Sequence, residues 1–277
     1  MLLKWAKQHG AAVLLNKKLE NIASESDAPP SEILETEADA VKACDIVIAI
    51  GGDGTILWTT RLVLDTGVQN KPILGVNSGR LGFMANIHQN SLVVALNHIL
   101  NGTYDIDRRH LLKATDEQGN EYRALNEFLF SKAQGSSMVK LEVEYDDRFV
   151  NRYWSDGLIV ASPTGSSAYN LSAGGPIVHP ETNVMVVTPI SPHMLTTRPL
   201  VLPADKILRV TVQEDPGKVM FSYDGENCEL CGCPEVVEIR RSQFCIELIQ
   251  LPGQNYFNTL RTKLMWGVDV RDHDAQS

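Results

Sequence analysis

Apolar and polar positions follow two different patterns within the first hundred residues. Short apolar runs predict strands at 46–50 and 73–76, and apolar residues at helical spacing predict helices in the opening segment, from about Ile56, and near 91–100. This succession of helices and strands is typical of an α/β domain. Such domains usually begin with a strand, whereas this sequence begins in a helix-like segment. We therefore expect either that a first strand is missing before Met1 or that the sheet is short.

From about residue 111 the pattern changes to β-branched residues and strict alternation. Segments of this kind, each predicting a strand, lie at 139–145, 207–212, 236–241 and 245–250. They predict a second, largely antiparallel domain. The tail at 256–264 again has helical spacing, and we expect it to return to the first domain.

The predicted fold class is therefore an α/β N-terminal domain of the nucleotide-binding type plus a mainly antiparallel β C-terminal domain, with a C-terminal helix returning to the first domain. We place the first domain at 1–102, with 255–277 returning to it, and the β-rich domain at 103–254. A chain of 277 residues is long enough for two domains.

Composition and charge narrow the class of protein. Apolar residues make up 43% of the chain and charged residues 21%, as in ordinary globular proteins. Lys and Arg number 25 against 34 Asp and Glu, so the net charge of −9 argues against a nucleic-acid partner. The sequence has no apolar run of membrane-spanning length and no signal-peptide core at its start. We expect a cytoplasmic protein without membrane contact.

Three of the five cysteines crowd into one short segment, at Cys228, Cys231 and Cys233. A Cys-x2-Cys pair can bind zinc, but no second pair follows at the usual spacing. We therefore expect no metal site in the protein and interpret these residues as reduced thiols on a β-hairpin.

The segment Gly51-Gly52-Asp53-Gly54-Thr55 joins a predicted strand to a predicted helix. In one interpretation the glycines supply unusual backbone angles and Asp53 caps the helix. In the other, the bare backbone lets a phosphate approach the helix N-terminus. A carboxylate repels phosphate, so Asp53 would then accept a proton or hold a metal ion. The sequence contains neither the Gly-x4-Gly-Lys-Ser/Thr loop nor the Gly-x-Gly-x-x-Gly fingerprint.

The segment 154–180 is rich in glycine and hydroxyl residues and follows the strand-like run at 158–161. Such a segment can be a plain surface loop. Because it also contains Tyr169, on which a flat ligand can stack, we favour a ligand site. Asn126 and Glu127 stand together in another strand-like run, where one of them is expected to face inward. A sugar hydroxyl or an adenine edge would satisfy such a buried group, and so would neighbouring backbone.

Four separated segments resemble the NAD kinase family: 51–55, 76–87, 124–131 and above all 156–178. Two more, 191–203 and 256–267, are similar to family segments in the same order, so the resemblance covers nearly the whole chain. It implies ATP-dependent phosphorylation of NAD on the adenosine ribose 2′-hydroxyl, which gives NADP. It also implies a homodimer or homotetramer, in which Asp156 acts across a subunit contact, and it makes 103–254 the NAD-binding domain.

The resemblance assigns roles to individual residues, with Asp53 as the general base. The implied NAD-binding residues are Asp53, Gly54, Phe83, Asn126, Glu127, Asp156, Thr164, Ser167, Ala168, Tyr169, Asn170, Leu171 and Ser172. The implied ATP and phosphate contacts are Gly51, Gly52, Gly54 and Thr55. Because no lysine follows the glycines, we expect Mg²⁺ or another divalent metal, bound mainly to the ATP phosphates, as the charge partner.

Some positions depart from the family pattern. Ser167 replaces the usual Thr and keeps the hydroxyl, while Trp154 stands where many members carry Arg or Gly. Glu226 replaces a Gln found in some members, which leaves its ligand contact open. Two alternatives remain at this stage: a lipid kinase of the diacylglycerol type, which shares the glycine-Asp motif, and an NAD-binding sensor that does not turn ATP over.

Overall fold

The computed structural model of the chain describes residues 1–21, 30–68, 71–79, 82–133, 135, 137–213, 215–227 and 233–265. The chain divides into two compact units, the first formed by Met1–Asp107 and Ile246–Ser277 and the second by Arg108–Cys245. These boundaries fall inside the long strands β6 (Asp105–Asp116) and β17 (Val236–Gln250), whereas the sequence pattern places them near residues 102 and 254.

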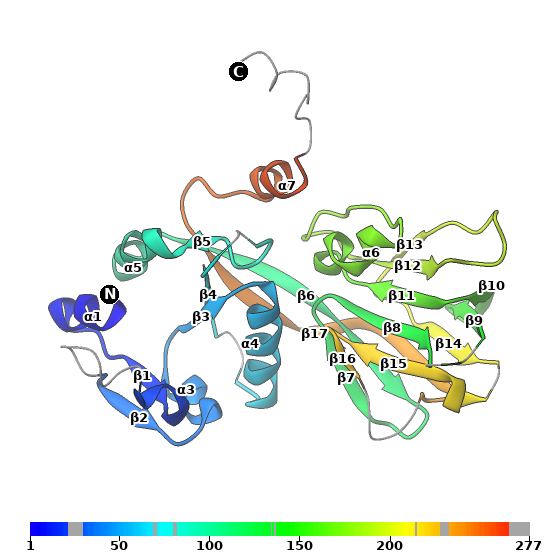
Figure 1. The fold of residues 1–277 in the computed structure, drawn as a ribbon, viewed down its shortest axis with the longest axis horizontal. Coiled ribbons are helices and arrows are strands. Elements are labelled where there is room, and N and C mark those ends of the chain that lie inside the picture. The colour runs from blue at the N-terminus through cyan, green and yellow to red at the C-terminus, as the bar shows by residue number, and fades with distance from the viewer. Residues whose placement is uncertain are drawn as a thin grey trace, which may run out of the picture. The chain divides into compact units, whose positions relative to one another are not determined.

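The first unit is an α/β domain (Figure 1). Its elements are α1 (Leu2–His9), β1 (Leu14–Asn16), β2 (Glu32–Leu34), α3 (Glu37–Ala43), β3 (Val47–Gly51), α4 (Asp53–Asp65), β4 (Ile73–Asn77), β5 (Ile87–His88), α5 (Leu92–Leu100) and α7 (Tyr256–Leu264), with short 3₁₀ turns at Lys17–Leu19 and Gln89–Ser91. The predicted strands and helices are confirmed, although α4 begins at Asp53 rather than near Ile56. No helix in the described ranges is both long and apolar enough to cross a membrane.

The strands β3, β4 and β5 of this unit pair in parallel, and helices cover both faces of this sheet. β3 and β4 pair from Val47↔Ile73 to Gly51↔Asn77. Alternate residues of β4 point to opposite faces, and Leu74 and Val76 join the cluster that α1 and α5 supply. On the other face Gly75 lies against Ile56 of α4. Burial on both faces explains why β4 is apolar throughout.

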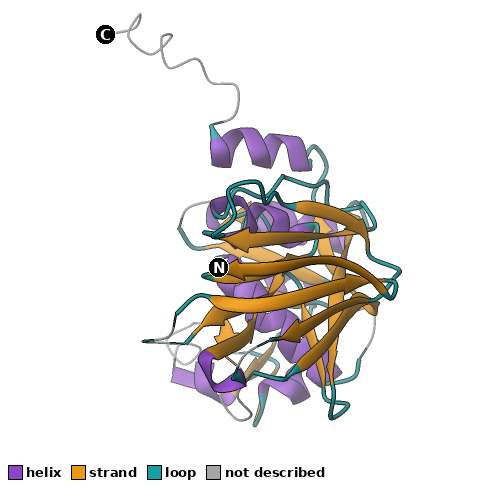
Figure 2. Cartoon of the chain, turned by 90° about the vertical axis from the view of Figure 1, so that its right-hand side faces the viewer, coloured by secondary structure: helices purple, strands orange, loops and turns teal. Residues whose placement is uncertain are grey.

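The second unit is antiparallel, as predicted, and strands, orange in Figure 2, form most of it. Its strands, besides most of β6 and β17, are β7 (Glu121–Ala124), β8 (Glu127–Lys132), β9 (Val139–Tyr145), β10 (Arg148–Ser155), β11 (Gly157–Ala161), β12 (Val184–Ile190), β13 (Leu200–Pro203), β14 (Leu208–Val212), β15 (Val219–Tyr223) and β16 (Glu226–Asn227). The segments 236–241 and 245–250, predicted as two strands, belong to the single strand β17.

One sheet of this unit has the order β13-β12-β11-β8-β15-β16, and its two faces are buried against different partners. Leu158 and Val160 of β11 join the main core of the unit, with residues of β9, β14 and β17. Ile159 and Ala161 face the other way and pack with Ala173 and residues near it. The glycine and hydroxyl segment therefore lies on a face of this sheet, and β11 is buried along its whole length.

Candidate active site

The turn between β3 and α4 needs its glycines for two different reasons. A Cβ on Gly51 would lie 2.0 Å from Oγ1 of Thr55, so only glycine fits there. Added Cβ atoms on Gly52 and Gly54 would meet nothing within 4 Å, which leaves open space beside the backbone. None of the three has a positive φ, so the interpretation that they supply unusual backbone angles is wrong.

Asp53 holds a second segment of the first unit in place. Its Oδ2 accepts a hydrogen bond from the N–H of Phe83 at 2.8 Å, and its Oδ1 accepts from Met84 and Ala85 at 2.9 and 3.0 Å. A Cβ on Gly82 would lie 2.1 Å from Oδ1, so the carboxylate reaches these amides only because residue 82 is glycine.

These contacts correct the capping interpretation of Asp53. The N-cap of α4 is Gly52, and no side chain caps this helix. Asp53 is the first helical residue, and its carboxylate serves the segment around Phe83 instead. Phe83, implied to flank adenine, is half-buried beside this carboxylate, whereas the neighbouring Arg80 and Leu81 lie outside the described residues.

In the second unit a single carboxylate organises the start of β8. Asp224 accepts hydrogen bonds from the N–H groups of Leu125 and Asn126 at 2.7 Å each and of Glu127 at 3.2 Å. Asn126 precedes the strand and is 8% exposed. Asp224, in the turn between β15 and β16, thus holds the backbone of both polar residues that the sequence singles out.

Glu127 is a half-buried acid without a hydrogen-bond partner at one oxygen. Its Oε2 is inaccessible to solvent and unsatisfied. Burial, and to a lesser extent the charge of Asp224, raises the pKa of Glu127 to about 7. Near neutral pH the side chain therefore exists in both protonation states, and its free oxygen can bond to a ligand.

The turn that opens the hydroxyl segment packs directly on Asn126. The Ser162 N–H donates to the carbonyl of Asn126 at 2.8 Å, and its hydroxyl donates to the carbonyl of Leu125. A Cβ on Gly165 would lie 2.1 Å from the Asn126 carbonyl oxygen, so the approach requires glycine. Two predicted site segments, 124–131 and 156–178, are thus held together within this unit.

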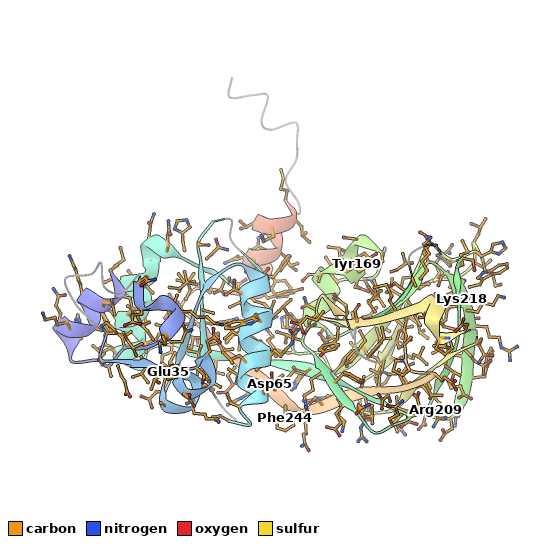
Figure 3. All side chains as sticks on the ribbon, turned by 60° about the horizontal axis from the view of Figure 1, so that its bottom comes forward. Glu35, Asp65, Tyr169, Arg209, Lys218 and Phe244 are labelled. Atoms are coloured by element: carbon orange, nitrogen blue, oxygen red, sulfur yellow. The ribbon has the colours of Figure 1, made fainter. Side chains whose placement is uncertain are left out.

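The side chains between Thr164 and Ser172 differ in exposure. Thr164 is buried, with Arg109 at 3.5 Å from its hydroxyl, while Ser167, Ala168 and Leu171 are half-buried. Tyr169 lies on α6 (Tyr169–Ser172) (Figure 3). It is 42% exposed, and Ser172 is exposed as well. The Tyr169 side chain is therefore partly accessible to a flat ligand.

Asn170 has a different environment from its neighbours. Its side chain is fully buried, donates to the carbonyls of Ser166 and Pro176 at 3.0 and 3.1 Å, and accepts from the Thr188 hydroxyl at 2.6 Å. A Cβ on Gly175 would lie 2.1 Å from this amide. The side chain of Asn170 thus fastens the segment to β12.

Two family models match the chain in sequence order. The ATP-NAD kinase N-terminal domain matches residues 1–104, and the ATP-NAD kinase C-terminal domain matches residues 125–251. The chain belongs to the ATP-NAD kinase family. Its relatives include the NAD kinase of Flavobacterium johnsoniae, 40% identical over 82% of this chain and 78% of that protein. The NAD kinase of Chlorobium phaeobacteroides is 35% identical over 99% of this chain and 92% of that protein.

Solved structures of two kinases share the fold. The crystal structure of yeast NADH kinase complexed with NADH has a TM-score of 0.87 at 23% identity, covering 98% of this chain and 84% of that one. The structure of an NAD kinase from Archaeoglobus fulgidus in complex with ATP has a TM-score of 0.71 at 23% identity, covering 92% and 98%.

In this ATP-NAD kinase family member, Asp156 lies at the break between β10 and β11. It forms an ion pair with Lys132 of β8 at 2.8 Å. The indole of Trp154, two residues earlier, stacks on the imidazole of His193 with ring centroids 4.4 Å apart. Both are partly exposed, as are the side chains of Lys132 and Asp156.

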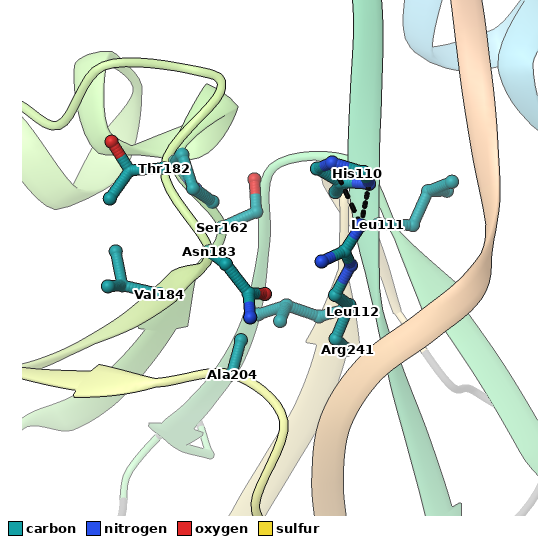
Figure 4. Close-up of a pocket in the computed structure, with 10 residues that line it drawn as sticks. His110, Leu111, Leu112, Ser162, Thr182, Asn183, Val184, Ala204 and Arg241 are labelled. Carbon is teal, nitrogen blue, oxygen red and sulfur yellow. Dashed lines mark hydrogen bonds between the residues drawn. The ribbon is translucent and has the colours of Figure 1, made fainter.

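A small cavity of about 10 Å³ is lined by residues that include Ser162, His110 and Arg241 (Figure 4). Arg241 of β17 donates to the ring of His110 of β6 at its edge. Burial, together with the charge of Arg241, lowers the pKa of His110. The volume is that of a single water molecule, so this cavity is not a nucleotide pocket.

The cysteine segment of this ATP-NAD kinase family member is mostly outside the described residues. This applies to Cys228 and Cys231, while Cys233 is buried. Across the described ranges, no three His, Cys, Asp or Glu side chains lie together in a group able to hold a metal ion.

Sequence reasoning missed four residues that order these sites: Gly82, Lys132, Ser162 and Asp224. One signal was available for Asp224, because Asp-Gly between two β-type runs is typical of a two-residue hairpin turn. The pattern gives no sign that the Asp224 side chain would reach a strand almost a hundred residues away.

Proposed function

We propose that the protein transfers the terminal phosphate of ATP to the 2′-hydroxyl of the adenosine ribose of NAD and so produces NADP and ADP. The observation that carries the proposal is the match of both ATP-NAD kinase domains, in order, to residues 1–104 and 125–251. The relatives that share 34–40% of their residues with this chain are named NAD kinases. Neither the lipid-kinase nor the sensor alternative has such support.

In the proposed reaction Asp53 accepts the proton of the ribose hydroxyl as its oxygen bonds to phosphorus and the bond to ADP breaks. A carboxylate offers about four lone-pair sites, and backbone amides occupy two on Oδ1 and one on Oδ2. One site on Oδ2 is left for the hydroxyl. Because the transition state of phosphoryl transfer is loose, the fixed position of Asp53 contributes alongside its basicity.

The proposed phosphate contacts divide into two groups. Gly52 and Gly54 leave open space at the N-terminus of α4, which supports a role for their backbone in phosphate binding. The Thr55 side chain occupies the space that a side chain on residue 51 would need, so we propose that Gly51 and Thr55 shape the turn. Mg²⁺ or another divalent metal would enter on the ATP phosphates and neutralise their charge.

For NAD, we propose that Asn126 and Glu127 bond to the adenosine moiety and that Tyr169 stacks on a ring. The buried, unsatisfied Glu127 Oε2 and the exposed side chain of Tyr169 support these roles. The remaining proposed contacts come from Gly54, Phe83, Asp156, Thr164, Ser167, Ala168, Leu171 and Ser172. Asn170, whose side chain is buried and hydrogen-bonded within the chain, would hold this segment in place for NAD. We further propose a homodimer or homotetramer in the cytoplasm, with Asp156 serving a neighbouring subunit.

The direct test supplies the purified full chain with ATP, Mg²⁺ and NAD and measures NADP with an NADP-specific dehydrogenase. We expect NADP in proportion to enzyme and none without ATP. Parallel assays offer a diacylglycerol in vesicles as acceptor and follow NAD binding without turnover. Phosphorylation of the lipid with NAD unchanged, or binding of NAD with no ATP consumed, would refute the proposal.

A further inference from the structure

The turn between β15 and β16 is a two-residue hairpin formed by Asp224 and Gly225, since Tyr223 pairs with Glu226. Both central residues have positive φ, 48° and 80°. This is the conformation of a type I′ turn, for which Asn-Gly and Asp-Gly are the favoured pairs. The turn alone explains Gly225, but Asn would serve at position 224 as well as Asp.

The hydrogen bonds of the side chain distinguish Asp from Asn at this position. Oδ1 of Asp224 accepts from the N–H groups of Asn126 and Glu127, and Oδ2 accepts from that of Leu125. In return, the Asp224 N–H donates to the Glu127 carbonyl at 3.1 Å. An amide has one acceptor oxygen instead of two, so three converging N–H donors match a carboxylate.

We infer that Asp224 is a positioning residue for NAD binding: it fixes the backbone at 125–127 so that the side chains of Asn126 and Glu127 meet the dinucleotide. The inference rests on the proposed function and deepens it, because it assigns a role to a residue that does not itself contact the substrate. The charge of Asp224 also raises the pKa of Glu127.

The charge that acts on Glu127 can be traced to this one turn. Two strands flank Glu127 in the sheet. On β11 it pairs with the uncharged Ala161, and on the other side β15 ends at Tyr223, which is followed by Asp224. Besides burial, Asp224 is what raises the pKa of Glu127. Removal of the Asp224 charge would therefore lower the pKa of Glu127, whereas a loss of stability elsewhere in the unit would not.

The test compares Asp224→Asn with Asp116→Asn. Asp116 is a matched control, because this buried carboxylate of the same unit also accepts backbone N–H groups, from Gln118 and Asn120, but lies in another hairpin. Both variants are expected to lose stability. Only Asp224→Asn is expected to raise KM for NAD, by about tenfold, with a smaller change in kcat and an unchanged KM for ATP.

Two further readouts separate positioning from stability. NAD affinity, measured by calorimetry from pH 5 to 9, is expected to change near pH 7 in the wild type, at lower pH in Asp224→Asn, and to lack this transition in Glu127→Gln. Hydrogen exchange at 125–127 is expected to increase in Asp224→Asn and to be unchanged in Asp116→Asn. This exchange does not depend on turnover.

The outcomes are distinguishable from failure of the proposed function. Wild-type protein that binds NAD but forms no NADP would refute the proposed function and leave the calorimetric test of Asp224 valid. Asp224→Asn with a lower Tm but an unchanged KM for NAD and an unchanged pH transition would overturn the inference. Loss of folding in both Asp224→Asn and Asp224→Gly, with Asp116→Asn folded, would assign Asp224 to stability alone and overturn it too.

Discussion

Replacement of Asp53 by Asn tests the proposed chemistry, and the structure changes what this substitution should do. From the sequence alone Asn is a neutral substitute, because it caps helices as well as Asp does. In the structure the carboxylate accepts three N–H groups. In Asp53→Asn the amide oxygen can keep the bonds from Met84 and Ala85, but the NH₂ group then faces the N–H of Phe83.

The cost in stability follows from that lost bond. A hydrogen bond to a charged group contributes about 1.5–3 kcal/mol, and in a protein of this size each kcal/mol shifts Tm by about 2–4 °C. We therefore expect Tm to fall by roughly 3–12 °C in Asp53→Asn. If Asp53 is also the base, kcat should fall by about 10²–10⁴-fold, the usual contribution of a positioned proton acceptor.

A matched variant separates the two roles of Asp53. Gly82→Ala keeps the carboxylate but places a methyl group 2.1 Å from the present position of Oδ1, which disturbs the same contacts. We expect a comparable loss of Tm with a fall in kcat at least tenfold smaller than in Asp53→Asn. Steady-state assays of NADP formation at saturating ATP and NAD, with Tm from calorimetry, decide the matter. Equal losses of kcat in the two variants would make Asp53 an anchor for the 82–85 segment and no base.

Three further predictions concern other parts of the site. Tyr169→Ala should raise KM for NAD by roughly ten- to a hundredfold, because base stacking contributes about 1–3 kcal/mol; a lower Tm with unchanged KM would make Tyr169 a packing residue. The contribution of Glu127 to wild-type stability should fall as pH rises from 4.5 to about 7, because only the unfolded state then releases the Glu127 proton. The stability of Glu127→Gln relative to wild type, followed as the difference in Tm, should therefore rise over this range, by at most about 3 kcal/mol in free energy of unfolding. A difference in Tm that does not change with pH would refute this. Cys231→Ser should remain active, with less than stoichiometric zinc by elemental analysis in the wild type; stoichiometric zinc needed for folding would contradict it.

The sequence predicts the elements of this fold well where one rule of periodicity decides them. β9 and α7 occupy the predicted ranges 139–145 and 256–264, since strict alternation and helical spacing leave little ambiguity there. The sequence pattern predicts two strands, 236–241 and 245–250, with an interruption between them, yet Ser242 in that interruption is buried within the continuous strand β17. Backbone hydrogen bonds to neighbouring strands can keep a strand continuous across such an interruption, and residue type alone does not reveal these bonds.

The site could be predicted only as far as the ligand-facing residues. A glycine beside a carboxylate in a strand-to-helix turn is visible in the sequence, and so is a hydroxyl segment after an apolar strand. The partners of Asp53 and Asp224 are not visible, because each carboxylate accepts consecutive backbone N–H groups from a remote segment. Backbone amides are the same at every residue, so such contacts leave no pattern in the sequence of the segment that donates the N–H groups. The trace that the Asp53 contacts leave is steric: a Cβ on Gly82 would lie 2.1 Å from Oδ1 of Asp53, so close contact explains this glycine. A glycine outside a turn, read with a distant unexplained carboxylate, is therefore the feature from which such an anchor can be inferred.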